Sequence, residues 1–209
     1  MINSIDEKDA YFAGLLFADG SFVNLNKNWR TSIFLGLTNK KMVESFSDWV
    51  GASKITKTVY KNKNHSTRFD ASKANSNVFN FLDKHGVVSK VQVSYRMAQN
   101  ENFWRGFIDG DGCISVHKPN NTVIGNFHAT NNSPVILYQL KYFADFLNNC
   151  TVRPDKNSYQ IGTHSNSAAK FIIKIYKDAS IFLPEKMKVA RRAASLLCSN
   201  HLHIPEGTE

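Results

Sequence analysis

Two nine-residue segments of this chain follow one pattern. Residues 12–20 read FAGLLFADG, and residues 104–112 read WRGFIDGDG. Each segment is an apolar run with a small residue at its third and seventh positions, and each ends in Asp-Gly. The two copies are separated by nearly half of the 209 residues. A repeat on this scale predicts two similar half-domains within one chain.

The small residues in both segments predict a close contact between two helices. Gly14 and Ala18 are four residues apart, as are Gly106 and Gly110, and this spacing places each pair on one helical face. A glycine inside a helix costs about 0.5–1 kcal/mol relative to alanine, so a repeated glycine indicates a packing requirement. We therefore expect the two segments to form helices whose backbones approach closely.

Each copy ends with an aspartate, Asp19 in the first and Asp111 in the second. An acid at the C-terminal end of a helix is unfavourable by roughly 0.3–1 kcal/mol because the helix dipole is negative there, and two nearby carboxylates also repel each other. A divalent cation would offset both costs, since hard cations favour carboxylate and carbonyl oxygen. The alternative is that each Asp-Gly pair only makes a tight turn into a strand. The matched pattern before both pairs argues against that alternative.

The rest of the chain predicts one order of elements twice. In the first half, a helix with Asp6 as its N-cap ends at Asp19-Gly20 and is followed by strands 21–26 and 31–38, helix 41–50, strands 55–60 and 68–71, and helix 75–85. In the second half we expect helix 103–109, strands 113–117 and 122–130, helix 134–147, strands 151–153 and 158–162, helix 168–176 and a last helix 184–198. Residue alternation marks the strands, and helical spacing of apolar residues marks the helices. These elements predict an α+β fold of two pseudo-symmetric α-β-β-α-β-β-α halves, residues 1–98 and 99–209.

The net charge and the cysteines indicate which class of binding partner and which cellular compartment to expect. The net charge of +9 favours a polyanionic partner, with an ordinary basic soluble protein as the alternative. The three cysteines form no CxxC pair or disulfide framework, which is typical of a reducing compartment. No apolar stretch approaches the roughly 20 residues needed to span a bilayer, so we expect no membrane partner. Residues 1–8 resemble no targeting peptide, so we expect an intracellular protein in the cytoplasm or nucleoid of a bacterial or phage host rather than in an organelle.

The two repeated segments resemble the LAGLIDADG motif, and the chain resembles a single-chain LAGLIDADG homing endonuclease over nearly its whole length. Two departures from the motif stand out. Phe17 occupies the place of the first Asp in one copy, and Trp104-Arg105 replace Leu-Ala in the other. The resemblance implies that the motif helices form the interface between the halves. It also implies that the four strands of each half form an antiparallel saddle along the DNA major groove, which is wide enough for a β-ribbon.

The resemblance further implies a metal site at the two motif ends. Asp19 and Asp111, aided by the backbone carbonyls of Ala18 and Gly110, would hold Mg²⁺ or Mn²⁺ beside the two scissile phosphates. Such ions activate water and stabilise the leaving oxygen. Ca²⁺ is expected to bind without supporting cleavage.

Family active sites also carry a polar residue after the second strand and a lysine before the last helix. The matching stretches LTNK and ATNN assign the polar place to Asn39 and Asn131, with Lys40 as a cationic partner. The stretches VSK and PEK assign the lysine place to Lys90 and Lys186. Each lysine would order water or neutralise charge on the phosphate, and a solvated surface charge is the alternative reading of each.

Strand and turn residues are the predicted DNA contacts, each with an ordinary solvated side chain as the alternative. Those expected to read bases are Asn24, Asn26, Arg30, Ser32, Lys57, Lys61 and Arg68 in the first half and Ser115, His117, Asn126, Arg153, Tyr159 and Gln160 in the second. Those expected to meet phosphate are Lys27, Lys63, Lys118 and Lys156. Lys40 is a further predicted DNA contact.

The predicted function is that of a monomeric, metal-dependent endonuclease that cuts double-stranded DNA at a long asymmetric target and promotes the mobility of an intron. The alternatives are an RNA maturase that binds its host intron RNA, a DNA-binding regulator that does not cleave, and a decayed endonuclease. The two retained motif acids favour cleavage over these alternatives.

Overall fold

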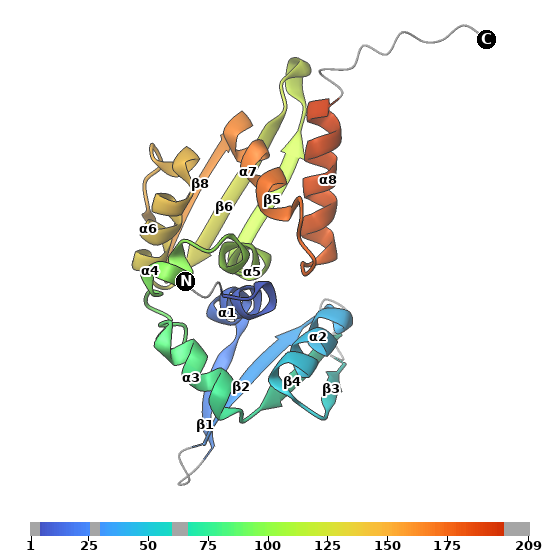
Figure 1. Cartoon of the computed structure of the whole chain (residues 1–209). Coiled ribbons are helices and arrows are strands. Elements are labelled where there is room, and N and C mark those ends of the chain that lie inside the picture. Colours follow the sequence, from blue (N-terminus) through green and yellow to red (C-terminus); the bar gives the residue numbers. More distant parts are fainter. Residues whose placement is uncertain (1–4, 26–29, 60–66, 199–209) are drawn as a thin grey trace, which may run out of the picture.

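Two antiparallel sheets flank a central pair of helices in the computed structural model, which describes residues 5–25, 30–59 and 67–198 (Figure 1). The first half contains α1 (Glu7–Asp19), β1 (Ser21–Leu25), β2 (Arg30–Leu37), α2 (Lys40–Val50), β3 (Ile55–Thr58), β4 (Arg68–Lys73) and α3 (Ser76–Lys84). The second half contains α4 (Tyr95–Ala98), α5 (Glu101–Asp111), β5 (Gly112–His117), η1 (Pro119–Asn121), β6 (Ile124–Asn131), α6 (Pro134–Phe143), η2 (Asp145–Leu147), β7 (Arg153–Asp155), β8 (Ser158–Ser165), α7 (Asn166–Tyr176) and α8 (Pro184–Cys198).

The two sheets have the same topology. The strand order is β1-β2-β4-β3 in one and β5-β6-β8-β7 in the other, and every pairing is antiparallel. The predicted α+β fold with two pseudo-symmetric halves is therefore confirmed. No helix in the described part of the chain is long and apolar enough to cross a membrane.

The contact between α1 and α5 explains the repeated glycines. A Cβ atom added to Gly14 would lie 1.9 Å from the Phe103 carbonyl oxygen, and one added to Gly106 would lie 2.0 Å from the Tyr11 carbonyl oxygen. Each glycine therefore touches the backbone of the opposite helix, in a reciprocal arrangement. Large buried side chains pack across the same contact, since the Phe17 ring of α1 lies 6.1 Å from the Phe107 ring of α5 between centroids.

Strand alternation separates a core face from an open face in each sheet. On β2 the buried Ile33 and Leu35 point into the core, and on β6 Phe127 and Ala129 do the same. The intervening residues of these strands, such as Asn126, occupy the opposite face. Each sheet therefore presents one face that helices do not fill.

One predicted helix is too long. The helix expected over residues 134–147 ends at Phe143, and Ala144 leaves helical geometry at φ −107° and ψ 87°. The chain then forms the short turn η2, which brings Phe146 against Phe127 and Phe171 at ring-centroid distances of 5.4 and 4.8 Å. Aromatic packing therefore overrides the local helical pattern. The short helix α4 was not predicted from the sequence.

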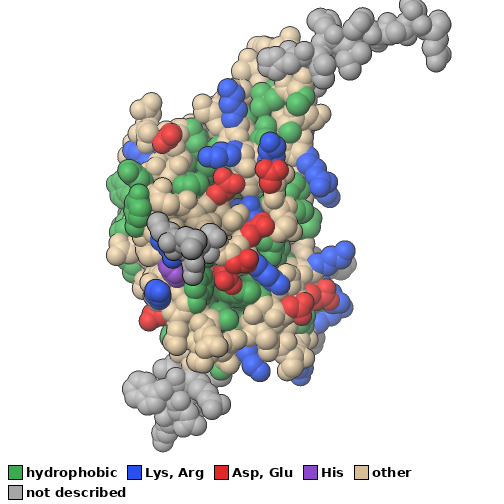
Figure 2. Space-filling model, viewed as in Figure 1, with side chains coloured by type: hydrophobic (Ala, Val, Ile, Leu, Met, Phe, Trp, Pro, Cys, Tyr) green, Lys and Arg blue, Asp and Glu red, His purple; other side chains and the backbone are tan. Residues whose placement is uncertain are grey.

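The surface around the central helices carries both signs of charge. Figure 2 shows acidic and basic side chains interspersed on the face that carries α1 and α5. Hydrophobic side chains gather over α6 on the same face, where Tyr138 and Tyr142 are exposed. This face is therefore not a uniformly basic surface.

Candidate active site

The C-terminal ends of α1 and α5 converge and bring the two motif aspartates together. Asp19 is the last residue of α1, and Asp111 is the last residue of α5. A Cβ atom added to Gly110 would lie 2.5 Å from the Ala18 Cβ and 3.0 Å from Oδ2 of Asp19. The small residues that let the helices meet therefore also let the two acids share one site.

Burial raises the pKa of both motif carboxylates, and the charge of Asp19 adds to the increase at Asp111. Burial raises the pKa of Asp19, and the nearby Lys90, Arg68 and Lys186 oppose that rise. Burial raises the pKa of Asp111 to about 6, with a further increase from the charge of Asp19. A dication beside two such acids would relieve both effects.

Both predicted lysines reach the ends of the motif helices. Lys90 donates a hydrogen bond from Nζ to the Gly20 carbonyl at 2.5 Å and contacts the Ala18 carbonyl at 3.4 Å. Lys186 donates from Nζ to the Gly112 carbonyl. Gly20 and Gly112 each follow a motif aspartate, so the two lysines occupy equivalent places in the two halves. Burial lowers the pKa of Lys90, and the charges of Asp111 and Asp19 counteract that shift.

The two predicted asparagines differ in their roles. Asn131 donates from Nδ2 to Oδ2 of Asp111 at 2.6 Å, and this bond lowers the pKa of that carboxyl against the effect of burial. Asn39 instead caps α2, because its Oδ1 accepts a hydrogen bond from the Met42 backbone N–H at 3.0 Å. Of these two asparagines, only Asn131 therefore holds a motif acid through a hydrogen bond of its side chain.

Strand register explains this difference. Ser21 pairs with Phe34 in the first sheet, and the equivalent Cys113 pairs with His128 in the second. Counting from these pairs, the structural counterpart of Asn131 is Leu37, and the counterpart of Asn39 is Ser133, the N-cap of α6. The sequence match of Asn39 with Asn131 is therefore wrong by two positions. The error arises because a helix-capping asparagine and a site asparagine look alike in sequence.

A cavity of about 210 Å³ lies beside Asp111 and Ala18, between the two halves. Its lining residues are Phe17, Ala18, Lys90, Asp111, Thr130, Asn131, Asn132 and Ser158. The described residues contain no group of three or more His, Cys, Asp or Glu side chains that could hold a metal. A metal here would therefore depend on the two aspartates, completed by backbone carbonyls and water, which is a donor set that suits Mg²⁺.

The open face of the second sheet carries connected polar side chains. Asn126 donates from Nδ2 to the Ser115 hydroxyl at 2.8 Å, and its Oδ1 is hydrogen-bonded to Nδ1 of His164 at 2.5 Å. His128 is hydrogen-bonded to Gln160 on the neighbouring strand. Sequence reasoning selected Ser115, Asn126 and Gln160 but missed the two histidines. The signal that could have found His128 is its spacing of two residues from Asn126, which places both side chains on one face of the strand.

The open face of the first sheet has a different composition. Arg68 pairs with Asp70 through a 2.6 Å contact and lies over the Phe34 ring at 5.4 Å from its centroid. Gly36 leaves room for this pair, because a Cβ atom there would lie 2.1 Å from Oδ1 of Asp70. The predicted DNA contact Arg68 is therefore on the open face, already partnered by an acid.

Several predicted DNA contacts are placed differently by the structure. Tyr159 packs against the core, since it alternates with Gln160 along β8. Lys57 pairs with the partly buried Phe69 and so lies on the helix-covered side of an edge strand. Tyr159 and Lys57 therefore lie on the side of their strands opposite the open face, because side chains alternate across a strand. The direct DNA contact of each stays a prediction.

Two further polar residues are less accessible to DNA than the sequence suggests. Ser32 is only 6% exposed, so it offers little surface for the direct DNA contact predicted for it. Lys40 forms an ion pair with Glu44 at 2.8 Å, one turn further along α2. Its positive charge is therefore shared with an acid on the same helix.

The remaining predicted contacts fall into two groups. Those with exposed or half-exposed side chains in strands and turns of the second half are Ser115, His117, Lys118, Asn126, Arg153, Lys156 and Gln160. Those that lie outside the described residues are Asn26, Lys27, Lys61 and Lys63, together with the side chains of Asn24 and Arg30.

Comparisons with known proteins agree with this geometry. The family model described as LAGLIDADG endonuclease matches residues 104–187. No curated protein matches the chain.

Solved structures cover nearly the whole chain at low identity. The LAGLIDADG meganuclease I-AabMI, bound to uncleaved DNA, is 15% identical with a TM-score of 0.60, and the match covers 97% of this chain and 94% of that one. The homing endonuclease I-WcaI, bound to its DNA recognition sequence, is 16% identical with a TM-score of 0.62 and coverage of 90% and 88%. I-SmaMI, bound to an uncleaved DNA target in the presence of calcium ions, is 13% identical with a TM-score of 0.56 and coverage of 94% of each chain. At these identities the matches demonstrate a shared fold.

Proposed function

Because this chain belongs to the LAGLIDADG homing endonuclease family, we propose that it cuts both strands of double-stranded DNA at a specific site and thereby promotes intron mobility. One observation carries the proposal. Two motif acids meet at the junction of the halves, and a lysine from each half reaches the glycine carbonyl that follows each acid. A pair of equivalent sites related by pseudo-symmetry suits a substrate with two scissile phosphates.

The residues of the site have distinct proposed roles. Asp19 and Asp111 would hold the metal, with the backbone carbonyls of Ala18 and Gly110 as further donors. Asn131 fixes the orientation of the Asp111 carboxylate through its hydrogen bond. Lys90 and Lys186 supply positive charge next to the phosphates, which stabilises the charge that develops during cleavage.

Mg²⁺ bound between the acids would supply an activated water and stabilise the leaving oxygen. Mn²⁺ is expected to substitute for it. Ca²⁺ is expected to bind without cleavage, and the I-SmaMI complex, which pairs calcium ions with an uncleaved target, supports this expectation.

DNA binding is assigned to the open faces of the two sheets. These faces carry Asn126, Gln160 and Arg153 in one half and Arg68 in the other, which are residue types that pair with base edges in the major groove. The net charge of +9 supplies the attraction to phosphate. Because the two faces differ, the target is expected to be asymmetric, and because both motifs lie in one chain, the monomer is expected to be sufficient.

The test is cleavage of DNA from the insertion locus by the wild type and by Asp19→Asn and Asp111→Asn, in Mg²⁺ and in EDTA. We expect one discrete metal-dependent double-strand cut by the wild type. Each substitution removes a metal-binding charge and should slow cleavage by about 10²-fold or more, while DNA affinity changes by less than about tenfold. Asp145→Asn, at an exposed acid on η2, is the matched control and should cleave normally.

Two outcomes would contradict the proposal. Full activity in both site variants would refute the assignment of the acids. Tight binding of DNA or intron RNA by a wild type that does not cut would indicate a regulator, a maturase or a decayed enzyme instead.

A further inference from the structure

Lys186 belongs to a helix whose first turn is tied to Asp109. The Leu183 carbonyl accepts hydrogen bonds from the backbone N–H groups of Lys186 and Met187, each at 3.1 Å. The Leu183 N–H in turn donates to Oδ2 of Asp109 at 2.7 Å. Asp109 therefore fixes the peptide from which α8 starts, three residues before the lysine.

Asp109 is itself held by both halves of the fold. Its side chain is buried, and it accepts hydrogen bonds from the Tyr11 hydroxyl on α1 at 2.6 Å and the Tyr176 hydroxyl on α7 at 2.5 Å. One carboxylate thus joins α1, α7 and the start of α8. The first half contributes to this junction through Tyr11.

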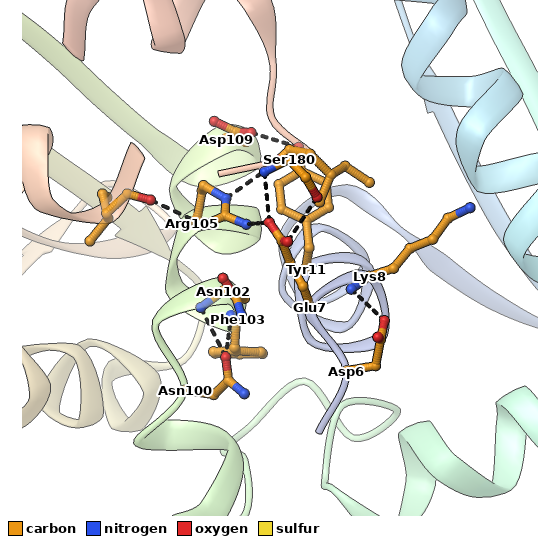
Figure 3. Close-up of polar contacts among 12 residues, drawn as sticks. Asp6, Glu7, Lys8, Tyr11, Asn100, Asn102, Phe103, Arg105, Asp109 and Ser180 are labelled. Atoms are coloured by element: carbon orange, nitrogen blue, oxygen red, sulfur yellow. Dashed lines mark hydrogen bonds and ion pairs between the residues drawn. The ribbon is translucent and has the colours of Figure 1, made fainter. Parts of the chain in front are cut away.

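A second contact from α1 holds the loop that precedes α8. Glu7 accepts hydrogen bonds from the Ser180 backbone N–H at 3.0 Å and from the Ser180 hydroxyl at 2.8 Å. Arg105, which is 2% exposed, pairs with Glu7 and donates from Nε to the Ile181 carbonyl at 3.0 Å. Figure 3 shows Glu7, Arg105 and Ser180 gathered beside the two motif helices. The first half therefore anchors the segment of the second half that carries Lys186.

The segment that carries Lys90 belongs to the first half and is held by residues of the second half. The Val91 carbonyl accepts a hydrogen bond from the Ser133 hydroxyl at 2.6 Å. The Gln139 side chain pairs with both backbone groups of Val93, at 3.0 Å and 2.8 Å. Lys90 has a φ of 53°, a left-handed conformation that persists in a non-glycine residue only where its surroundings hold it. Ser133 and Gln139 belong to the second half and supply that support.

We propose that each active-site lysine is positioned by hydrogen bonds from the opposite half of the fold, Lys186 by Glu7 and Tyr11 and Lys90 by Ser133 and Gln139. Glu7 and Gln139 are thus positioning residues. The catalytic consequence depends on the proposed function. If each lysine acts at one scissile phosphate, loosening one set of contacts slows the cleavage of one DNA strand more than the other.

The experiment compares the rates at which the two strands of an end-labelled target are cut. Lys186→Met and Lys90→Met define which strand each lysine serves. Glu7→Ala should slow cleavage of the same DNA strand that Lys186→Met affects, and Gln139→Met should slow cleavage of the other strand. We expect each rate to fall by about tenfold, because a small displacement of a catalytic group is costly. Nicked DNA should accumulate in both variants. Glu7→Gln keeps an oxygen for Arg105 and Ser180 and should restore most of the rate. Gln139→Met tests the inference independently if Glu7→Ala does not fold.

Asp9→Ala is the matched control. Asp9 lies on the same helix as Glu7, but it accepts a hydrogen bond from Trp49 of its own half at 2.8 Å. Its removal should leave the ratio of the two strand rates unchanged. A general loss of stability would slow cleavage of both strands alike. The ratio of the two cleavage rates therefore distinguishes an effect on lysine position from an effect on folding.

Amide hydrogen exchange gives a second readout that needs no cleavage. Exchange should accelerate over residues 177–187 in Glu7→Ala and over residues 86–94 in Gln139→Met, with the other segment unchanged in each. Unchanged strand ratios together with unchanged exchange would overturn the inference while leaving the proposed function intact. If the wild type cuts no DNA, the proposed function fails, and the exchange data alone decide whether the contacts position these segments.

Discussion

At the scale of single residues, the junction of the halves depends on the absence of side-chain atoms. Gly14 and Gly106 each occupy a helix interior, where glycine is an unfavourable residue. Both are within contact of the opposite backbone, so the cost of glycine is offset by the close packing that it allows. Gly110 has the same role next to Asp19, where its lack of a side chain lets the helix ends pack closely and so brings the two motif acids together.

We expect Gly106→Ala to destabilise the protein by about 1–3 kcal/mol, the range for overpacked cores, despite the higher helix propensity of alanine. The reason is that the new Cβ would lie 2.0 Å from the Tyr11 carbonyl oxygen, which is backbone and cannot rotate away. Urea unfolding monitored by circular dichroism measures the change. Gly14→Ala is the pseudo-symmetric counterpart and should cost a similar amount. A variant as stable as the wild type would show that the helices do not approach this closely.

At the scale of elements, helix caps and strand registers decide which polar residues are available to the site. Asn39 caps α2 and Ser133 caps α6 from equivalent positions. Asn131 is two residues earlier, where its side chain reaches Asp111. The two halves therefore share their helices and strands but differ in the polar partner of the motif acid.

We expect Asn39→Ala to lower the free energy of unfolding by about 1 kcal/mol through loss of the cap, with cleavage retained at temperatures where the variant is folded. Asn39→Ser preserves a capping oxygen and should retain most of the stability. Asn131→Ala, in contrast, should slow cleavage because Asp111 loses its 2.6 Å partner. Thermal unfolding and cleavage rates measured on the same samples check both expectations. Slow cleavage in both Asn39 variants would instead support a direct role for Asn39 in the site.

At the scale of the whole molecule, one fold is used twice with two different surfaces. The second sheet presents Ser115, Asn126 and His164 in a hydrogen-bonded row. The first presents an Arg68–Asp70 ion pair against Phe34. Similar backbones with different side chains suit a monomer that reads two unlike half-sites.

We therefore expect the protein to discriminate against palindromic DNA. A target in which one half-site is replaced by an inverted copy of the other should bind at least about tenfold more weakly than the native target, because each mismatched base pair typically costs about 1–3 kcal/mol. Fluorescence anisotropy at fixed ionic strength measures this difference for both possible palindromes. Equal affinity for the native target and both palindromes would mean that the halves read the same sequence.

Much of the fold and part of the candidate site could be predicted from the sequence because the signals are local. The four-residue spacing of Gly14 with Ala18, and its repetition in Gly106 and Gly110, predicted the paired helices. The Asp-Gly ends placed Asp19 and Asp111 at the ends of these helices, and the structure has them there.

The tertiary structure decided those features of the site that depend on strand register and on contacts between residues far apart in the sequence. Which residue stands opposite Asp111, and which side of a strand Tyr159 or Lys57 faces, depends on how strands pair, and a shift of one position reverses the face. The contact of Glu7 with Ser180 joins residues 173 positions apart, and no local pattern indicates it. The sequence by itself determined the helices and acids that make the site, because spacing within a helix sets its faces. Only the folded chain determined which polar groups hold those acids and lysines in place, because packing between the halves brings them together.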